Sequence, residues 1–159
     1  MKLYVISDTH NYTDRVIEIY NKLDSIDLII HLGDMERDAR KISETLGKDV
    51  LSVKGNNESV CTAENFHILK TEYGNIFLTH GHIENVKSGL LNLLYKTQEF
   101  DCVAAFFGHT HRPHLSQEKG IYLLNPGSLT LPDRGSTVSY AVVNIAEDCF
   151  SASIMHPDS

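Results

Sequence analysis

Residues 103–111 have the sequence Val103-Ala104-Ala105-Phe106-Phe107-Gly108-His109-Thr110-His111, an apolar run that stops at a glycine and two histidines. A short apolar run bounded by a turn residue predicts a buried strand. Gly108 allows the chain to bend sharply where that strand ends. We therefore expect His109 and His111 on a loop at the carboxyl end of a strand, where open α/β sheets bind their ligands. Neutral imidazole is the commonest metal ligand, although two loop histidines facing water would give the same pattern.

The composition limits the class of protein. The chain has 159 residues, 42% of them hydrophobic, and we expect one globular domain over residues 1–159. The net charge of −7 argues against a nucleic-acid or anionic-membrane surface built on bulk positive charge. No apolar run is long enough to span a bilayer, and the first residues show no signal-peptide cleavage site. The three cysteines form no zinc-type pair and no disulfide framework, so we expect a cytoplasmic protein with reduced thiols.

Apolar strands alternate with amphipathic helices over the first third of the chain. The first expected helix carries Val16 and Ile19 inward, and the second carries Ala39 and Ile42. This β-α-β-α-β order implies parallel strands, and a third helix is expected near 86–95. The expected strands are 3–6, 28–32, 50–53, 66–72, 76–78, 103–107 and 121–124, followed by antiparallel strands at 140–145 and 150–155.

Five of these strands end in residues that can bind a metal ion. They are Asp8 with His10, Asp34, Asn56, His80 with His82, and His109 with His111. Because the carboxyl ends of parallel strands share one edge, we expect these side chains to meet in space. Two carboxylates, an amide oxygen and several imidazoles suit Mn, Fe, Zn, Ni or Co better than Ca or Mg. The number of ligands exceeds one tetrahedral site and matches two adjacent cations, as in two-metal phosphoryl transfer.

The five motifs resemble those of the calcineurin-like metallophosphoesterases, in the same order and strand context. They are Asp8-x-His10, Gly33-Asp34, Gly55-Asn56-Asn57-Glu58, Thr79-His80-Gly81-His82 and Gly108-His109-Thr110-His111. The small size and the Asn125-Pro126-Gly127-Ser128 turn resemble the compact bacterial and archaeal phosphodiesterase branch that contains the YfcE-like proteins. The resemblance implies an α/β fold, a β-sandwich of mixed sheets flanked by helices with a βαβαβ start and antiparallel C-terminal strands.

The resemblance also implies a role for each motif residue. Asp8, His10 and His111 would hold one metal, Asn56, His80 and His109 would hold the second, and Asp34 would bridge both. The cofactors would be two divalent transition-metal ions, manganese first, with nickel, zinc, iron and cobalt as alternatives. A hydroxide between them would attack the phosphorus of a small phosphodiester, with Asp34 and Asn56 at the catalytic centre.

One position departs from the wider family. That family often has a histidine where this chain has Asn57, and an amide cannot supply a proton at neutral pH. We therefore expect substrates with good leaving groups, such as aryl phosphodiesters, and modest turnover of alkyl diesters. Asn57 and His82 are expected to contact the substrate. His82 would assist the leaving group, with a place behind a metal ligand as its alternative.

Several other residues allow two interpretations. His31 is expected to be a core histidine hydrogen-bonded to a neighbour, with support of the metal centre as the alternative. Glu58 would support the asparagine motif or begin a helix, and Arg134 would be an exposed loop arginine or a cation that reaches the substrate. The expected solvent-facing side of the second helix carries Glu36, Arg37, Asp38 and Arg40.

Three other functions compete with the phosphodiesterase. A retromer subunit resembles this fold but acts as a protein-interaction scaffold, having lost ligating side chains that this chain retains. Phosphomonoesterase activity stays open because metal ions do not themselves reject a dianion. A nuclease is disfavoured by the acidic, minimal chain, so nucleic acid and membranes are not expected as partners. The resemblance implies self-association, as a dimer or tetramer, and the sequence does not identify the physiological substrate.

Overall fold

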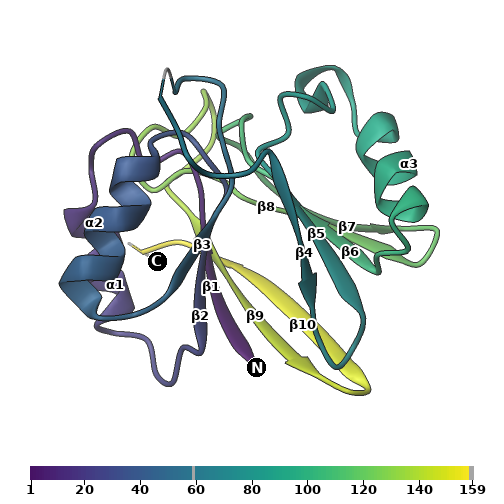
Figure 1. The fold of residues 1–159 in the computed structure, drawn as a ribbon, viewed down its shortest axis with the longest axis horizontal. Helices are drawn as coiled ribbons and strands as arrows, with labels where there is room; N and C mark the ends of the chain where they lie inside the picture. The colour runs from purple at the N-terminus through teal and green to yellow at the C-terminus, as the bar shows by residue number, and fades with distance from the viewer. Residues whose placement is uncertain (59, 158–159) are drawn as a thin grey trace.

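Two five-stranded sheets face each other in the computed structural model, which describes residues 1–58 and 60–157 (Figure 1). The first sheet has the strand order β10-β9-β1-β2-β3, and the second has the order β4-β5-β6-β8-β7. Strands β1, β2 and β3 run parallel, as do β5, β6 and β8. The remaining strands pair antiparallel. This arrangement confirms the predicted sandwich of mixed sheets.

The strands are short and follow the apolar runs of the sequence. Their bounds are β1 Lys2–Ile6, β2 Leu28–His31, β3 Val50–Ser52, β4 Phe66–Lys70, β5 Asn75–Thr79, β6 Ala104–Phe106, β7 Pro113–Glu118, β8 Ile121–Pro126, β9 Tyr140–Ala146 and β10 Cys149–Met155. The helices are α1 Asp14–Tyr20, α2 Glu36–Leu46 and α3 Leu91–Glu99, with a 3-10 turn η1 at Val86–Ser88. None of the helices in the described residues is long and apolar enough to cross a membrane.

Packing on both faces of the sheets explains why many strands are continuous apolar runs in the sequence. Leu3 and Val5 of β1 pack between the two sheets, while Tyr4 and Ile6 pack outward beneath α1 and α2. On the second sheet, Phe77 and Ala105 pack beneath α3 in the same way. Figure 1 shows α1 and α2 outside one sheet and α3 outside the other. Because both faces of the central strands are covered, their successive residues are nearly all apolar and show no alternation, whereas the edge strand β10 keeps exposed residues at every second position.

Two expectations about secondary structure are wrong. The predicted helix at 86–95 is two pieces, because Gly89 adopts φ +139° between η1 and α3, which no helix accepts. Strand β7 was not predicted, because Pro113–Glu118 contains a single large aliphatic residue, Leu115, and lies at an edge of the sheet. Lys119 and Gly120, both at positive φ, form the two-residue turn between β7 and β8, and that X-Gly pair was the available signal.

Candidate metal centre

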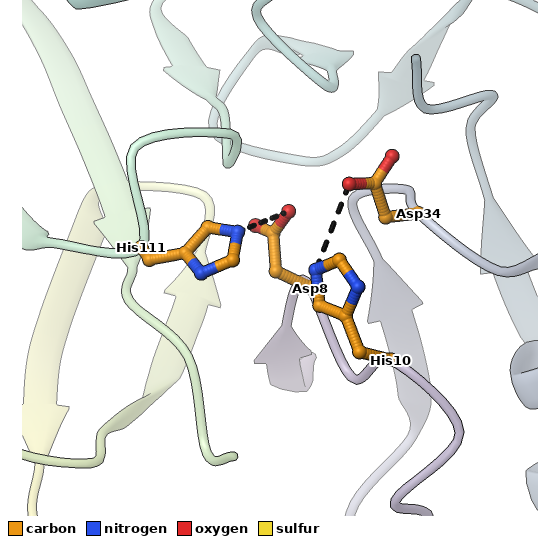
Figure 2. Close-up of side chains that lie close together, drawn as sticks. All are labelled: Asp8, His10, Asp34 and His111. Atoms are coloured by element: carbon orange, nitrogen blue, oxygen red, sulfur yellow. Dashed lines mark ion pairs between the residues drawn. The ribbon is translucent and has the colours of Figure 1, made fainter. Parts of the chain in front are cut away.

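Both sheets contribute to the cluster of predicted ligands. Asp8, Asp34 and Asn56 follow β1, β2 and β3 of the first sheet, and His80 and His109 follow β5 and β6 of the second. Figure 2 shows the four side chains converging, Asp8 and His10 from the loop after β1, Asp34 from the loop after β2 and His111 from the loop after β6. One potential ligand atom from each of these four lies within 4.8 Å of the others. The strand ends that were expected to share one sheet edge therefore meet at the adjoining edges of two sheets.

The distances place Asp8 and Asp34 at the centre of this cluster. His111 Nε2 lies 3.3 Å from Asp8 Oδ1, and His10 Nε2 lies 3.7 Å from Asp34 Oδ2. His80 Nε2 lies 3.8 Å from Asp8 Oδ1 and 3.5 Å from Asp34 Oδ1. Asp8, Asp34 and His80 are almost fully buried. The two carboxylates therefore lie among three imidazoles away from bulk water.

The remaining predicted ligands adjoin the same group. Asn56 Oδ1 lies 3.1 Å from His80 Nε2. The His80 and His109 rings stand nearly edge to face with centroids 5.0 Å apart. The backbone N–H of His109 donates to Asp8 Oδ2 at 3.0 Å. All seven predicted ligands are thus gathered in one region of the described structure.

The backbone at the predicted ligands has an unusual conformation. The left-handed region is uncommon for residues other than glycine, and outliers of this kind cluster at functional sites. Five of the seven predicted ligands adopt it: Asp8 (φ 54°), His10 (46°), Asp34 (59°), His109 (70°) and His111 (56°). Each costs about 1 kcal/mol or more, so the surrounding fold must hold these loops in place.

The imidazoles are oriented in a way that fits a bound cation. Nδ1 of His80 lies 2.7 Å from the Leu32 carbonyl, and Nδ1 of His111 lies 2.6 Å from the Leu131 carbonyl. A carbonyl only accepts, so each Nδ1 carries a hydrogen and Nε2 is the nitrogen that can present a lone pair to a cation. Those lone pairs face carboxylate oxygens, an arrangement that needs a proton or a cation between them.

Unpaired atoms support the same fit. Among the described residues, Asp8 Oδ1 and His10 Nε2 are buried without a hydrogen-bond partner. An unpaired buried polar atom is costly, so natural proteins rarely leave one without a function. Oxygen and imidazole donors together suit divalent transition metals. The residues present therefore fit a metal centre.

Two of the predicted ligands have the charge state that metal binding requires at neutral pH. Burial by itself would raise the pKa of Asp8, but its interactions with His111 and His80 outweigh burial and lower this pKa to about 2. The interaction with Asp8 in turn raises the pKa of His111. Burial, followed by the charges of His80 and Lys87, lowers the pKa of His109 to about 4. Asp8 is therefore an anion and His109 a neutral imidazole, the protonation states that bind metals.

A buried hydrogen-bond chain ties the first two ligand loops together. The Gly33 N–H donates to His31 Nδ1 at 3.2 Å, so His31 Nε2 carries the hydrogen and donates to Thr9 Oγ1 at 2.9 Å. Thr9 Oγ1 donates to Asp38 Oδ2 at 2.5 Å, and the Asn11 N–H donates to the same oxygen at 2.8 Å. The expectation of a satisfied core histidine at residue 31 is confirmed.

The expectation that Asp38 lies on a solvated helix face is wrong. Its side chain is only 3% exposed, because α2 turns this residue toward the loop that carries Thr9 and His10. The prediction was wrong because the neighbouring residues Glu36, Arg37 and Arg40 are also charged, as on a solvent-exposed helix face. Arg37 itself donates to Asn11 Oδ1, which lies in the loop after β1.

Other supporting residues lie in the loop after β8, where the sequence predicted that Ser128 shapes a loop near the site but gave no signal for Thr130 or Leu131. Ser128 Oγ and Thr130 Oγ1 both donate to the Asp8 carbonyl, at 3.0 and 3.3 Å. The Leu131 carbonyl orients His111. Only the Asn125-Pro126-Gly127-Ser128 turn hinted at this loop, and Thr130 and Leu131 carry no motif of their own.

The two predicted substrate residues have different surroundings. Asn57 donates from its side chain to Asp34 Oδ2 at 2.7 Å and from its backbone to Asp34 Oδ1 at 3.2 Å. His82 lies beside His80 and His109, and its Nδ1 is buried without a hydrogen-bond partner among the described residues. Glu58 accepts from the Gly55 and Glu36 N–H groups, so it both supports the asparagine motif and meets the start of α2.

Comparison with known proteins identifies the family. The sequence is 32% identical over 169 residues to phosphodiesterase YfcE of Escherichia coli strain K12, covering 91% of this chain and 88% of that protein. A conserved uncharacterized protein from Streptococcus pneumoniae TIGR4 has a TM-score of 0.84 at 27% identity, covering 99% of this chain and 90% of that one. The Zn²⁺ complex of Vps29 from Entamoeba histolytica has a TM-score of 0.81 at 21% identity, covers 98% of each chain, and shows the shared fold alone.

The family model agrees with these relatives and with the resemblance inferred from the five motifs. Residues 1–148 match the model of the calcineurin-like phosphoesterase superfamily domain. The ligand cluster lies within this range, and so do all the strands described above except β10. The chain therefore belongs to the calcineurin-like phosphoesterase superfamily, a membership that implies a metal-dependent phosphoester hydrolase.

Proposed function

We propose that this protein is a phosphodiesterase that hydrolyses small phosphodiesters at a centre of two divalent metal ions. The observation that supports this most strongly is the convergence of Asp8 and Asp34 with the imidazoles of His10, His80 and His111 in a buried cluster. The name of the relative YfcE adds support for a diester over a monoester.

We assign the seven ligands to two cations that share Asp34. Asp8, His10 and His111 would hold one cation, Asn56, His80 and His109 would hold the other, and the Asp34 carboxylate would contact both. Manganese is our first choice, and nickel, zinc, iron and cobalt suit the same donors. When bound, such cations generate hydroxide from water near neutral pH and offset charge on the phosphoryl oxygens.

The protein's own residues prepare this chemistry. The Leu32 and Leu131 carbonyls hold His80 and His111 with Nε2 directed at the carboxylates. Asn57 donates to both oxygens of Asp34, and its amide cannot itself protonate a leaving alkoxide. His82, whose pKa is lowered by burial and by His80, is neutral at pH 7 and is our candidate for a contact with the substrate.

The decisive experiment uses metal-stripped protein refilled separately with Mn²⁺, Ni²⁺, Zn²⁺ or Mg²⁺. We expect hydrolysis of an aryl phosphodiester with a transition metal, little with Mg²⁺, and slower hydrolysis of an aryl phosphomonoester. A faster monoester reaction would replace the proposal with a phosphomonoesterase. Inactivity on both substrates with all four metals would refute the enzyme and favour a scaffold.

The scaffold alternative rests on the fold shared with Vps29. It is disfavoured because all seven expected positions carry side chains able to bind a metal, which a scaffold does not require. Self-association as a dimer or tetramer and a cytoplasmic location stay predictions. Size-exclusion chromatography with light scattering measures the first, and cell fractionation the second.

A further inference from the structure

A cavity of about 770 Å³ adjoins the candidate metal centre, and its wall includes His109 and His111. Its size lies within the range of about 300–1,000 Å³ typical of small-molecule sites. Leu90, Leu131 and Pro132 supply apolar wall, and three cations, Lys87, Arg112 and Arg134, also line it. A substrate whose phosphate meets the metal centre would therefore have room for a nucleoside-sized group in this cavity.

The local charge of the cavity is opposite to that of the chain. The chain carries a net charge of −7, yet Asp133 is the one acidic residue among those lining the cavity. That carboxylate is already paired, because Arg112 Nη2 lies 2.7 Å from Asp133 Oδ2. No ion pair within the described residues engages the side chains of Lys87 or Arg134. The cavity is therefore left with two unneutralised positive charges.

The wall that carries these charges is fixed to the candidate metal centre. His111 is joined to the loop after β8 through the Leu131 carbonyl and through the Asp133 N–H, which donates to the His111 carbonyl at 3.0 Å. The hydrogen bond from Arg112 to Asp133 joins the same two segments, the loop after β6 and the loop after β8. On the other side, Lys87 belongs to η1 and lines the same cavity as His109. Lys87 and Arg134 therefore share this cavity with two of the predicted metal ligands.

We propose that this cavity selects phosphodiesters in which one esterified group is a nucleoside-sized ring system bearing a second anionic group. The inference rests on the proposed phosphodiesterase function and specifies its substrate class. The apolar wall would contact the ring system, and Lys87 and Arg134 would attract the second anion. Two positive charges a few ångströms from a phosphate monoester favour its binding by roughly tenfold, and added salt screens that gain.

The test compares two substrates that differ by one phosphate. They are the p-nitrophenyl ester of thymidine 5′-monophosphate and the same ester with a 3′-phosphate, which share a leaving group and a scissile bond. For the Mn²⁺-loaded protein we expect kcat/KM to be about tenfold higher for the 3′-phosphorylated ester, mainly through KM. We expect this preference to shrink strongly at about 0.5 M salt.

Charge-removing variants identify the source of the preference. Lys87→Met and Arg134→Met should each reduce the ratio of kcat/KM between the two esters, and the double variant should bring that ratio close to one. Lys48→Met is the matched control, because it makes the same change of net charge at the amino end of β3 and does not line the cavity. Arg112 is left intact because its pair with Asp133 supports the loop.

A binding measurement separates this inference from the proposed function. Calorimetric titration of the Mn²⁺-loaded protein with thymidine 3′,5′-bisphosphate and with thymidine 5′-monophosphate should show the same preference, with the same loss in the double variant. Equal kcat/KM for the two esters, or a preference that survives in the double variant, would overturn the inference and leave the phosphodiesterase standing. If neither ester is hydrolysed but the bisphosphate still binds more tightly, the proposed function fails and the anion-selective cavity stands.

Discussion

Gly55→Ala should disturb the candidate metal centre although Gly55 has no side chain to bind a metal. A Cβ atom at this position would lie 2.7 Å from Asp34 Cα and closer still to Asp34 N and Oδ1. Real Cβ atoms essentially never approach other atoms so closely. The obstacle is mainly backbone, which cannot swing aside as a flexible side chain does, so the loop after β2 or the loop after β3 must move.

The size of the effect follows from that clash. Overpacking a buried site costs typically 1–3 kcal/mol, and a backbone neighbour puts Gly55→Ala at about 3 kcal/mol. For a domain of this size each kcal/mol lowers Tm by about 2–4 °C, so we expect Tm of the metal-free protein to fall by about 6–12 °C. Because Asp34 is the proposed bridging ligand, Mn²⁺ affinity should fall by about 10-fold or more.

Differential scanning calorimetry and calorimetric Mn²⁺ titration measure the two effects. The matched control is Gly120→Ala, where an added Cβ meets nothing within 4 Å and φ is +77°. It should lower Tm by only about 2–4 °C, the cost of a left-handed alanine, and leave metal affinity unchanged. If Gly55→Ala keeps the Mn²⁺ affinity and Tm of the wild type, the placement of Asp34 against the Gly55 backbone is refuted.

Three further predictions concern the ligands and the buried chain behind them. Asp34→Ala should lose more bound metal than His82→Ala, and equal metal content by elemental analysis would contradict a bridging role for Asp34. Thr9→Val removes the hydroxyl shared by His31 and Asp38 and should destabilise the protein by about 1–3 kcal/mol in urea unfolding, whereas Thr9→Ser should recover most of that loss; equal stability of both variants would contradict the chain. Burial lowers the pKa of His31 from its ordinary value of 6.5. As the pH falls below 6.5, His31 is therefore protonated in the unfolded chain but stays neutral in the folded protein. The metal-free protein should therefore lose stability as pH falls below about 6.5, by at most about 1.4 kcal/mol per pH unit from this group, and His31→Gln should show a shallower slope; an unchanged slope would contradict a buried neutral His31.

The sequence by itself was enough for most of the strands and for the side chains that the fold gathers at the candidate metal centre. Both sheets are built on short apolar runs, and each run that ends in Asp, Asn or His does so where the chain leaves the core. A strand that is buried on both faces is a continuous apolar run, so it can be predicted from the sequence without knowing which strands it pairs with. The order of the five motifs then indicated the family, which the match over residues 1–148 confirms.

The sequence failed where the local pattern and the tertiary surroundings disagree. Asp38 stands among charged residues but is buried, because its partners Thr9 and Asn11 lie about 30 positions away in the chain. Strand β7 lacks an apolar pattern because it pairs at an edge, and only its ladder with β8 makes it a strand.

What only the tertiary structure decided is how the ligands are held and what lies beside them. The carbonyls of Leu32 and Leu131 select the imidazole tautomers, and no residue type at those positions could reveal this, since every residue has a carbonyl. The cavity combines Lys87 from η1 with Arg134 from a loop 47 positions later. The cavity is positively charged because Asp133 pairs with Arg112, which leaves Lys87 and Arg134 without an opposing charge. Neither the composition nor the periodicity of the sequence shows which distant residues neutralise each other.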